Sequence, residues 1–223
     1  MHATSEIAAR LDRRTADDRL LDHPFYRAWA DGTLTLDDLR FYSAQYFNQV
    51  EAFPGYLEAL AGRLPESRAR TSVAENLADE RDGDHPGLWL RFAAAVGADE
   101  RTVRDTPAEQ ETLACIAAFE TAARERSPLF ALGMIYGYES QTPGVSATKI
   151  AGLRERYGVG GAGLDYFELH GELDVEHAGE LAAAIAELSE SEDDLREAEE
   201  GAAAGARAVS GLLDGVARVR GIA

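Results

Sequence analysis

A chain of 223 residues, 45% of them hydrophobic, is long enough to bury a substantial core as one large domain or two small ones. Its formal net charge of −18 at pH 7 argues against nucleic acid or an anionic membrane as a partner, and its single cysteine, Cys115, excludes an internal disulfide. No run approaches the ~20 apolar residues of a membrane span, and the N-terminus lacks the apolar stretch of a signal peptide, so we expect a soluble cytoplasmic protein.

Apolar residues recur with the helical period almost throughout the chain, and no segment alternates as a strand does. In the first half, the pattern predicts helices over residues 4–19, 25–30, 36–63 and 67–82. Thr35, followed three residues later by Asp38, is typical of a helix N-cap. We expect the helix that follows this cap to bend near Pro54.

In the second half, the same period predicts helices over residues 86–96, 107–126, 128–141, 145–157, 164–188 and 192–219. Pro86 and Pro128 stand where a first helical turn tolerates proline, whereas Pro143 interrupts the pattern. We find no linker and no internal repeat. The sequence therefore predicts an all-α fold, a compact helical bundle in a single domain over residues 1–223.

The segment from His170 to His177 contains two of the five histidines of the chain. Within a helix, His170, Asp174 and His177 stand at positions i, i+4 and i+7, which fall within an arc of roughly 60° on one face. Two imidazoles and a carboxylate side by side are a ligand set that suits iron, manganese or zinc. The alternative is an exposed polar face of an acidic protein, since Glu172 and Glu176 lie in the same window.

Two other segments could supply further metal ligands. Glu80 and His85 stand close together across a predicted helix end, where the alternative is an ordinary exposed helix terminus. Glu139 ends an otherwise apolar helix, and a buried carboxylate is costly unless it is paired or bound to a cation. The alternative for Glu139 is an ion pair with a buried arginine.

Four short motifs follow one another along the chain. They are His23-Pro-Phe-Tyr-Arg-Ala-Trp29, Asn76-Leu-Ala-Asp-Glu80, Tyr136-Gly-Tyr-Glu-Ser-Gln-Thr-Pro143, and His170-x3-Asp174-x2-His177. Together they resemble the haem-oxygenase-like di-metal oxidases, in particular the group typified by the Chlamydia protein associating with death domains. The thiaminases and pyrroloquinoline-quinone synthases are more distant relatives of this group. The resemblance covers residues 20–180 and, more loosely, both terminal helices.

This resemblance implies a metal centre with three histidine and three carboxylate ligands. In this sequence the ligands are Glu80, His85, Glu139, His170, Asp174 and His177. Such a set would hold two irons or an iron–manganese pair, with open positions for O₂ as co-substrate. The interval from Glu80 to His85 is shorter than in relatives, so Asp79 or Asp84 remains an alternative or additional ligand. The resemblance also suggests a homodimer.

The best-known activity of this group is to make para-aminobenzoate, for folate supply, from the protein's own side chains. The resemblance implies that Tyr26 supplies the ring and that Lys149, the only lysine of the chain, supplies the amine. Tyr42 and Tyr46, one helical turn apart, could deliver electrons to that site. The alternatives are that Tyr26 only packs in the core and that the single lysine has no function.

Three other functions stay open at this point. The first is a related oxidase that acts on an external amine or amino acid. The second is a metal-free hydrolase of the thiaminase type, although residues 132–135, where its cysteine is expected, include Gly133 and Met134 instead. The third is an interaction protein. The glycines of residues 158–163 match a dinucleotide-binding pattern, but they follow a helix rather than a strand and predict a loop.

Overall fold

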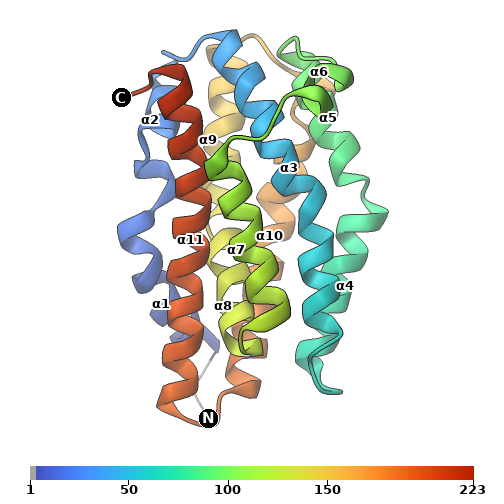
Figure 1. Cartoon of the computed structure of the whole chain (residues 1–223), viewed down its shortest axis with the longest axis vertical. Helices are drawn as coiled ribbons and strands as arrows, with labels where there is room; N and C mark the ends of the chain where they lie inside the picture. The colour runs from blue at the N-terminus through green and yellow to red at the C-terminus, as the bar shows by residue number, and fades with distance from the viewer. Residues whose placement is uncertain (1–3) are drawn as a thin grey trace.

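The structure is a computed structural model that describes residues 4–223. In that part of the chain every regular element is helical, which confirms the predicted all-α fold (Figure 1). The helices are α1 (Thr4–Thr15), α2 (Pro24–Asp31), α3 (Leu36–Ala61), α4 (Arg68–Asp82), α5 (His85–Ala95), α6 (Glu100–Asp105), α7 (Gln110–Glu125), α8 (Pro128–Glu139), α9 (Thr142–Glu155), α10 (Asp165–Leu188) and α11 (Glu192–Arg220). Among these helices none combines the length and the apolar character needed to cross a membrane.

The helices differ from the prediction at several places. The first helix ends at Thr15 rather than at residue 19, and short 3₁₀ turns follow it. Helix α6 was not predicted because its six residues are too few to show a period, yet the Asp99 side chain caps it by accepting a hydrogen bond from the Thr102 amide. Pro143 lies in the first turn of α9 and does not interrupt the helix, because that turn needs no amide hydrogen from it.

Capping of α3 agrees with the prediction. The Thr35 hydroxyl accepts a hydrogen bond from the Asp38 amide, and the Asp38 carboxylate accepts one from the Thr35 amide, so the two residues form a complete capping box. The helix then continues through Pro54 to Ala61. This long helix places Tyr42 and Tyr46 in the interior of the molecule.

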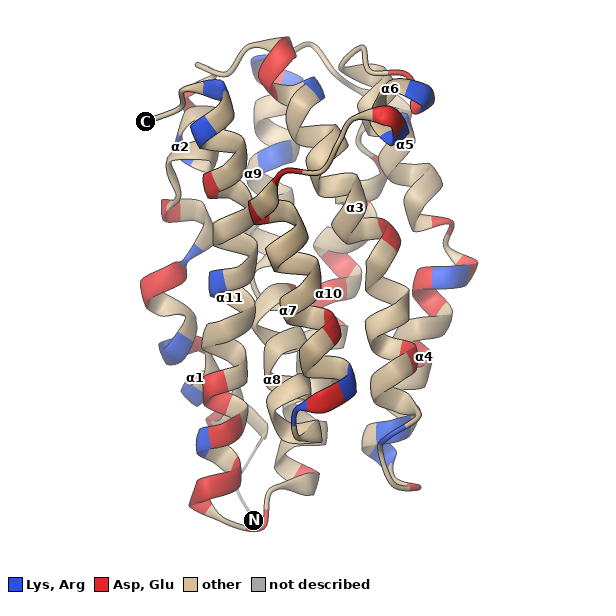
Figure 2. Cartoon of the chain, viewed as in Figure 1, with Lys and Arg blue, Asp and Glu red and all other residues tan. Residues whose placement is uncertain are grey.

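Helix α8 is buried on all sides, as expected of a helix that is apolar around its whole circumference. It crosses α11 through glycines on both helices. A Cβ atom at Gly133 would lie 2.0 Å from the Ala198 carbonyl oxygen, and one at Gly205 would lie 2.1 Å from the Met134 carbonyl oxygen. The two backbones therefore touch, and this contact holds α8 in one position. In Figure 2 the charged residues lie mainly on the surrounding helices, and the only charged residue of α8 is Glu139 at its end.

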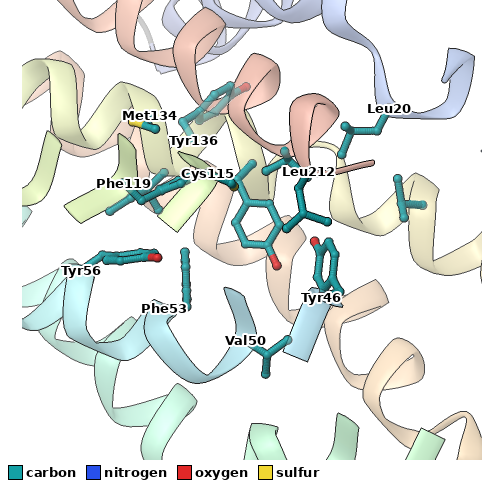
Figure 3. Packing of buried hydrophobic residues seen from close by; sticks show 14 of the residues in the cluster. Leu20, Tyr46, Val50, Phe53, Tyr56, Cys115, Phe119, Met134, Tyr136 and Leu212 are labelled. Atoms are coloured by element: carbon teal, nitrogen blue, oxygen red, sulfur yellow. The ribbon is translucent and has the colours of Figure 1, made fainter. Parts of the chain in front are cut away.

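Helix α10 packs against α4, α5, α8 and α9. Each of the first three contributes a predicted ligand near its contact with α10, so the topology directs these residues toward one another. Around them lies a continuous hydrophobic cluster, part of which Figure 3 shows. Cys115 belongs to this cluster and is buried.

Candidate metal centre and lysine site

Helix α10 presents His170, Asp174 and His177 on its buried face, while Glu172 and Glu176 between them are exposed. The helical spacing predicted that the three side chains share a face. Their burial contradicts the alternative of an exposed polar surface. Buried imidazoles and carboxylates need partners, and the neighbouring helices supply them.

The first group of side chains consists of Glu80, His85 and His170. Atom Nδ1 of His85 lies 2.7 Å from Oε2 of Glu80, and Nε2 of His170 lies 3.8 Å from Oε1 of the same carboxylate. Nδ1 of His170 donates a hydrogen bond to the Tyr166 carbonyl at 2.7 Å, so Nε2 is the nitrogen that faces Glu80. One ligand atom from each of the three residues lies within 4.8 Å of the others, close enough to share one cation.

The second group consists of Glu139, Asp174 and His177. Nδ1 of His177 lies 3.7 Å from Oδ1 of Asp174 and 3.9 Å from Oε1 of Glu139. Nε2 of His177 lies 3.2 Å from Oδ2 of Asp79, and as a donor there it leaves the lone pair of Nδ1 facing the two buried carboxylates. Asn76 donates a hydrogen bond to Oε1 of Glu139 at 2.9 Å, and no arginine among residues 4–223 pairs with this carboxylate.

The pKa values of the buried carboxylates differ because their partners differ. Burial opposes ionisation of Glu80, but hydrogen bonds with His170 and His85 outweigh it and lower its pKa to about 2. Burial, together with the negative charge of Glu80, raises the pKa of Glu139 to about 8 despite the hydrogen bond from Asn76. Burial and the nearby Glu139 and Glu80 likewise raise the pKa of Asp174 well above its usual value. Without a cation Glu139 and Asp174 therefore hold protons more readily than ordinary carboxylates do, whereas Glu80 stays ionised.

Both groups contain buried donor atoms that a bound cation would satisfy. Three buried atoms of the two groups have no hydrogen-bond partner among residues 4–223, namely Nε2 of His85, Oε2 of Glu139 and Nδ1 of His177. Leaving such atoms unsatisfied costs free energy, which a bound cation would recover. Imidazole and carboxylate donors in this ratio suit iron and manganese.

The two alternative ligands lie outside the groups. The backbone of Asp84 has φ +50°, and its side chain is 73% exposed, with Arg91 3.9 Å away. This turn directs Asp84 to solvent and His85 to the interior, which explains how the short interval still brings His85 to Glu80. Asp79 is half-exposed, and its Oδ2 atom lies 3.2 Å from Nε2 of His177, the ring nitrogen that faces away from the buried carboxylates.

The second functional element is a buried site around Lys149 on α9. Its Nζ donates a hydrogen bond to the Tyr42 hydroxyl at 2.8 Å, and that oxygen lies 3.3 Å from the Tyr26 hydroxyl. The structure therefore brings together the three residues for which the resemblance or the helical spacing suggested a role in the reaction. All three are buried, with exposed fractions of 3% or less.

Aromatic rings enclose the Lys149 amine. Its Nζ lies between 4.9 and 5.5 Å from the ring centroids of Tyr26, Tyr42, Tyr46, Trp89 and Phe167. No carboxylate of residues 4–223 forms an ion pair with it, and burial lowers its pKa well below the usual lysine value. The site therefore favours the uncharged form of this amine more than water does.

Aromatic contacts connect the metal-ligand groups with this site. The ring of Tyr166 stacks on His170 at 4.0 Å, and its edge meets Trp89 at 4.9 Å. Trp89 in turn stacks on Tyr46 at 5.0 Å. Neither Tyr166 nor Trp89 was among the residues predicted to function. For Tyr166 the signal was its position one helical turn before His170.

The remaining sequence features take no part in either site. Cys115 contacts Gln49 and its thiol pKa is raised to about 12 by burial, so it is no ready nucleophile. The glycine-rich segment after α9 forms a loop with one 3₁₀ turn, as predicted.

Comparison with known proteins points in the same direction. Residues 40–210 match the profile of a family described as iron-containing redox enzymes. A 4-aminobenzoate synthase of Chlamydia pneumoniae is 36% identical over 172 residues, which cover 76% of this chain and 77% of that protein. A 4-aminobenzoate synthase of Nitrosomonas europaea is 32% identical over 226 residues, covering 96% and 92%.

Solved structures confirm the fold. A domain of Shewanella denitrificans with a haem-oxygenase-like fold superposes with a TM-score of 0.84 at 17% identity. The superposition covers 99% of this chain and 94% of that domain. At this identity the likeness concerns the architecture, which is the one that the sequence motifs implied.

Proposed function

The chain belongs to the family of iron-containing redox enzymes, and we propose that it makes 4-aminobenzoate from its own side chains. In this proposal Tyr26 supplies the aromatic ring and Lys149 supplies the nitrogen. The oxidant is O₂, used at a centre of two irons or of one iron and one manganese. The ligands of that centre are Glu80, His85, Glu139, His170, Asp174 and His177.

The observation on which the proposal rests is the environment of Lys149. A buried lysine without a carboxylate partner lowers the stability of the fold. Every other residue of the Lys and Arg set is arginine, so the single lysine is not explained by a structural need for positive charge. The amine lies among oxidisable rings, which suits a reacting nitrogen rather than a surface charge. As a neutral amine it is nucleophilic.

The position of Tyr26 supports its role as the source of the ring. In tyrosine the Cβ atom stands para to the hydroxyl, and in 4-aminobenzoate the carboxylate stands para to the amine. Tyr42 lies between the hydroxyl of Tyr26 and the amine of Lys149, with a hydrogen-bond distance to each. It is placed to orient the amine and to move a proton between the two groups.

The metal centre and the lysine site are joined by ring contacts through Tyr166, Trp89 and Tyr46. When bound, the metal pair would supply the electrons and the oxidising power that convert the Tyr26 ring with O₂. Stacked phenol and indole rings are the protein groups most readily oxidised, so they are suited to electron transfer between the two places. Burial also protects the reacting side chains from water.

Isotopic labelling of the lysine tests the proposal directly. Protein containing lysine labelled with ¹⁵N at Nζ is loaded anaerobically with Fe²⁺, or with Fe²⁺ and Mn²⁺, reduced, and exposed to O₂. We expect 4-aminobenzoate that contains ¹⁵N, formed in a single turnover. The mass of the protein should change, and the modified residue should be Tyr26. Lys149→Arg and Tyr26→Phe should abolish the product.

Other results would identify the alternatives. Unlabelled product formed over many turnovers from an added amine, with Tyr26 intact, would indicate an oxidase with an external substrate. An unchanged yield in Lys149→Arg would remove the lysine from the mechanism. Hydrolysis of thiamine by protein that binds no metal would restore the thiaminase reading.

A further inference from the structure

A pocket of about 380 Å³ opens between α4 and α10, on the outer side of the metal-ligand groups. The proposed reaction does not use it. Residues on one face of each helix line it, including Glu75, Asn76, Asp79, Glu176, His177 and Glu180. On α4, Asp79 stands four positions after Glu75 and three after Asn76, a spacing that makes it a surface neighbour of both.

His177 separates this pocket from the interior carboxylates. Its outer nitrogen, Nε2, lies 3.2 Å from Asp79, and its inner nitrogen, Nδ1, faces Asp174 and Glu139. The ring is 6% exposed, so one side chain lies between the pocket and the second group of ligands. Movement of this one ring would therefore connect the two spaces.

The lining of the pocket is strongly negative. It contains four carboxylates and neither lysine nor arginine. Glu180 accepts a hydrogen bond from Ser72 and pairs with the exposed Arg68, whereas Glu75 and Glu176 have no ion pair or hydrogen bond within residues 4–223. A concave surface with charges of one sign raises the local concentration of oppositely charged ions.

Two buried oxygen atoms without a hydrogen-bond partner lie one behind the other, the first in the pocket lining and the second in the interior. Asn76 lines the pocket, is 4% exposed, and has no hydrogen-bond partner for its Oδ1 atom. Its Nδ2 group holds Glu139, whose Oε2 atom is also without a partner. Carboxylate and amide oxygens are ligands that a hydrated divalent cation accepts readily in exchange for water.

We propose that this acidic pocket is the loading site of the metal centre, where a hydrated Fe²⁺ or Mn²⁺ binds first before it passes His177. The inference rests on the metal centre of the proposed function. Glu75 and Glu176 attract the cation, and the Asn76 amide oxygen replaces water ligands on the way to Glu139. Asp79 holds His177 by its outer nitrogen until the cation arrives.

The rate of Mn²⁺ uptake by metal-free protein tests this role. The probe is Mn²⁺ alone, followed in rapid-mixing experiments by loss of the electron paramagnetic resonance signal of the free ion. We expect the double variant Glu75→Gln/Glu176→Gln to take up Mn²⁺ at least about threefold more slowly and with a weaker dependence on salt. The number of ions bound at equilibrium should stay that of the wild type.

A matched control is the double variant Glu125→Gln/Glu155→Gln, which changes the net charge equally on two exposed positions outside the pocket. Its uptake rate should equal that of the wild type. Unchanged uptake in the pocket variant, or equal slowing in both variants, overturns the loading site. Wild-type protein that binds Mn²⁺ by this route but makes no 4-aminobenzoate leaves the loading site intact and removes the proposed reaction, whereas wild type that binds no metal removes both.

Discussion

Oε1 of Glu139 on α8 lies 3.9 Å from Nδ1 of His177 on α10. Two further buried carboxylates, Glu80 and Asp174, lie near enough to interact electrostatically with Glu139. Glu80, Glu139 and His177, which are separated by 59 and 38 positions in the chain, thus share one charged interior. Such an arrangement is unfavourable for a metal-free fold and favourable for one that binds cations.

The first prediction concerns the pH dependence of the metal-free protein. Glu139 has a pKa of about 8 in the fold, above the usual 4.5, so between these values the folded state binds a proton that the unfolded state lacks. The stability that this group contributes is complete below pH 4.5 and is lost as the pH rises toward 8. Relative to Glu139→Gln, the free energy of unfolding should fall by something on the order of 2 kcal/mol over this range.

Denaturant unfolding of both metal-free proteins at several pH values measures this difference. Addition of Mn²⁺ should restore the stability of the wild type at pH 8, where the cation competes less with a proton than at lower pH, and should have less effect near pH 6. A difference between the two proteins that is constant across the range would contradict the assignment.

The second prediction concerns the ligands of α10. Asp174→Asn keeps the shape of the side chain but removes a charged oxygen ligand, so we expect the metal content after loading and desalting to fall by roughly half. Metal analysis measures this loss. Glu172→Gln, an exposed change two positions away on the same helix, should keep the full content, and an equal loss there would point to a nonspecific effect.

The third prediction separates function from stability at Lys149. Lys149→Met keeps an unbranched side chain, shorter by the amine nitrogen alone, so the protein should be as stable as the wild type or more stable, while 4-aminobenzoate is lost. The folded pKa of this lysine lies below the usual 10.5, so the wild type gains stability relative to the variant as the pH rises toward that value. Thermal unfolding at several alkaline pH values checks the sign.

The fourth prediction concerns Tyr42. Tyr42→Phe retains the ring but removes the oxygen to which Lys149 donates its hydrogen bond, so the amine loses its orientation toward Tyr26. We expect about tenfold slower formation of 4-aminobenzoate with unchanged metal content. Chemical-quench measurements of product over time, with metal analysis of the same samples, test this. A full rate in Tyr42→Phe would mean that Tyr42 only packs against its neighbours.

The fifth prediction concerns the contact between α8 and α11. A Cβ atom at Gly205 would lie 2.1 Å from the Met134 carbonyl oxygen, so Gly205→Ala must separate the helices and should lower the free energy of unfolding by roughly 2–4 kcal/mol. Gly211→Ala on the same helix meets nothing within 4 Å and should raise stability by about 0.5–1 kcal/mol. Denaturant unfolding of both variants measures the contrast.

The features of this protein that lie within single helices could be predicted from the sequence. The helical period predicted the all-α fold, and the Thr35 capping box followed from two residues three positions apart. The shared face of His170, Asp174 and His177 also needed only the geometry of one helix. These features depend on neighbours in the chain, so they do not require knowledge of how helices pack.

Packing between helices decided the rest. The helical period of the sequence did not show that Glu80 on α4 and Glu139 on α8 both face α10. Only the resemblance to a known family, through its ordered motifs, suggested this arrangement. The outward turn of Asp84, the ring contacts of Tyr166 and the glycine contact of α8 with α11 were not foreseen at all. Each depends on backbone crossings between segments distant in sequence, where a shift of one ångström changes which side chains meet, and no periodic pattern records such a distance.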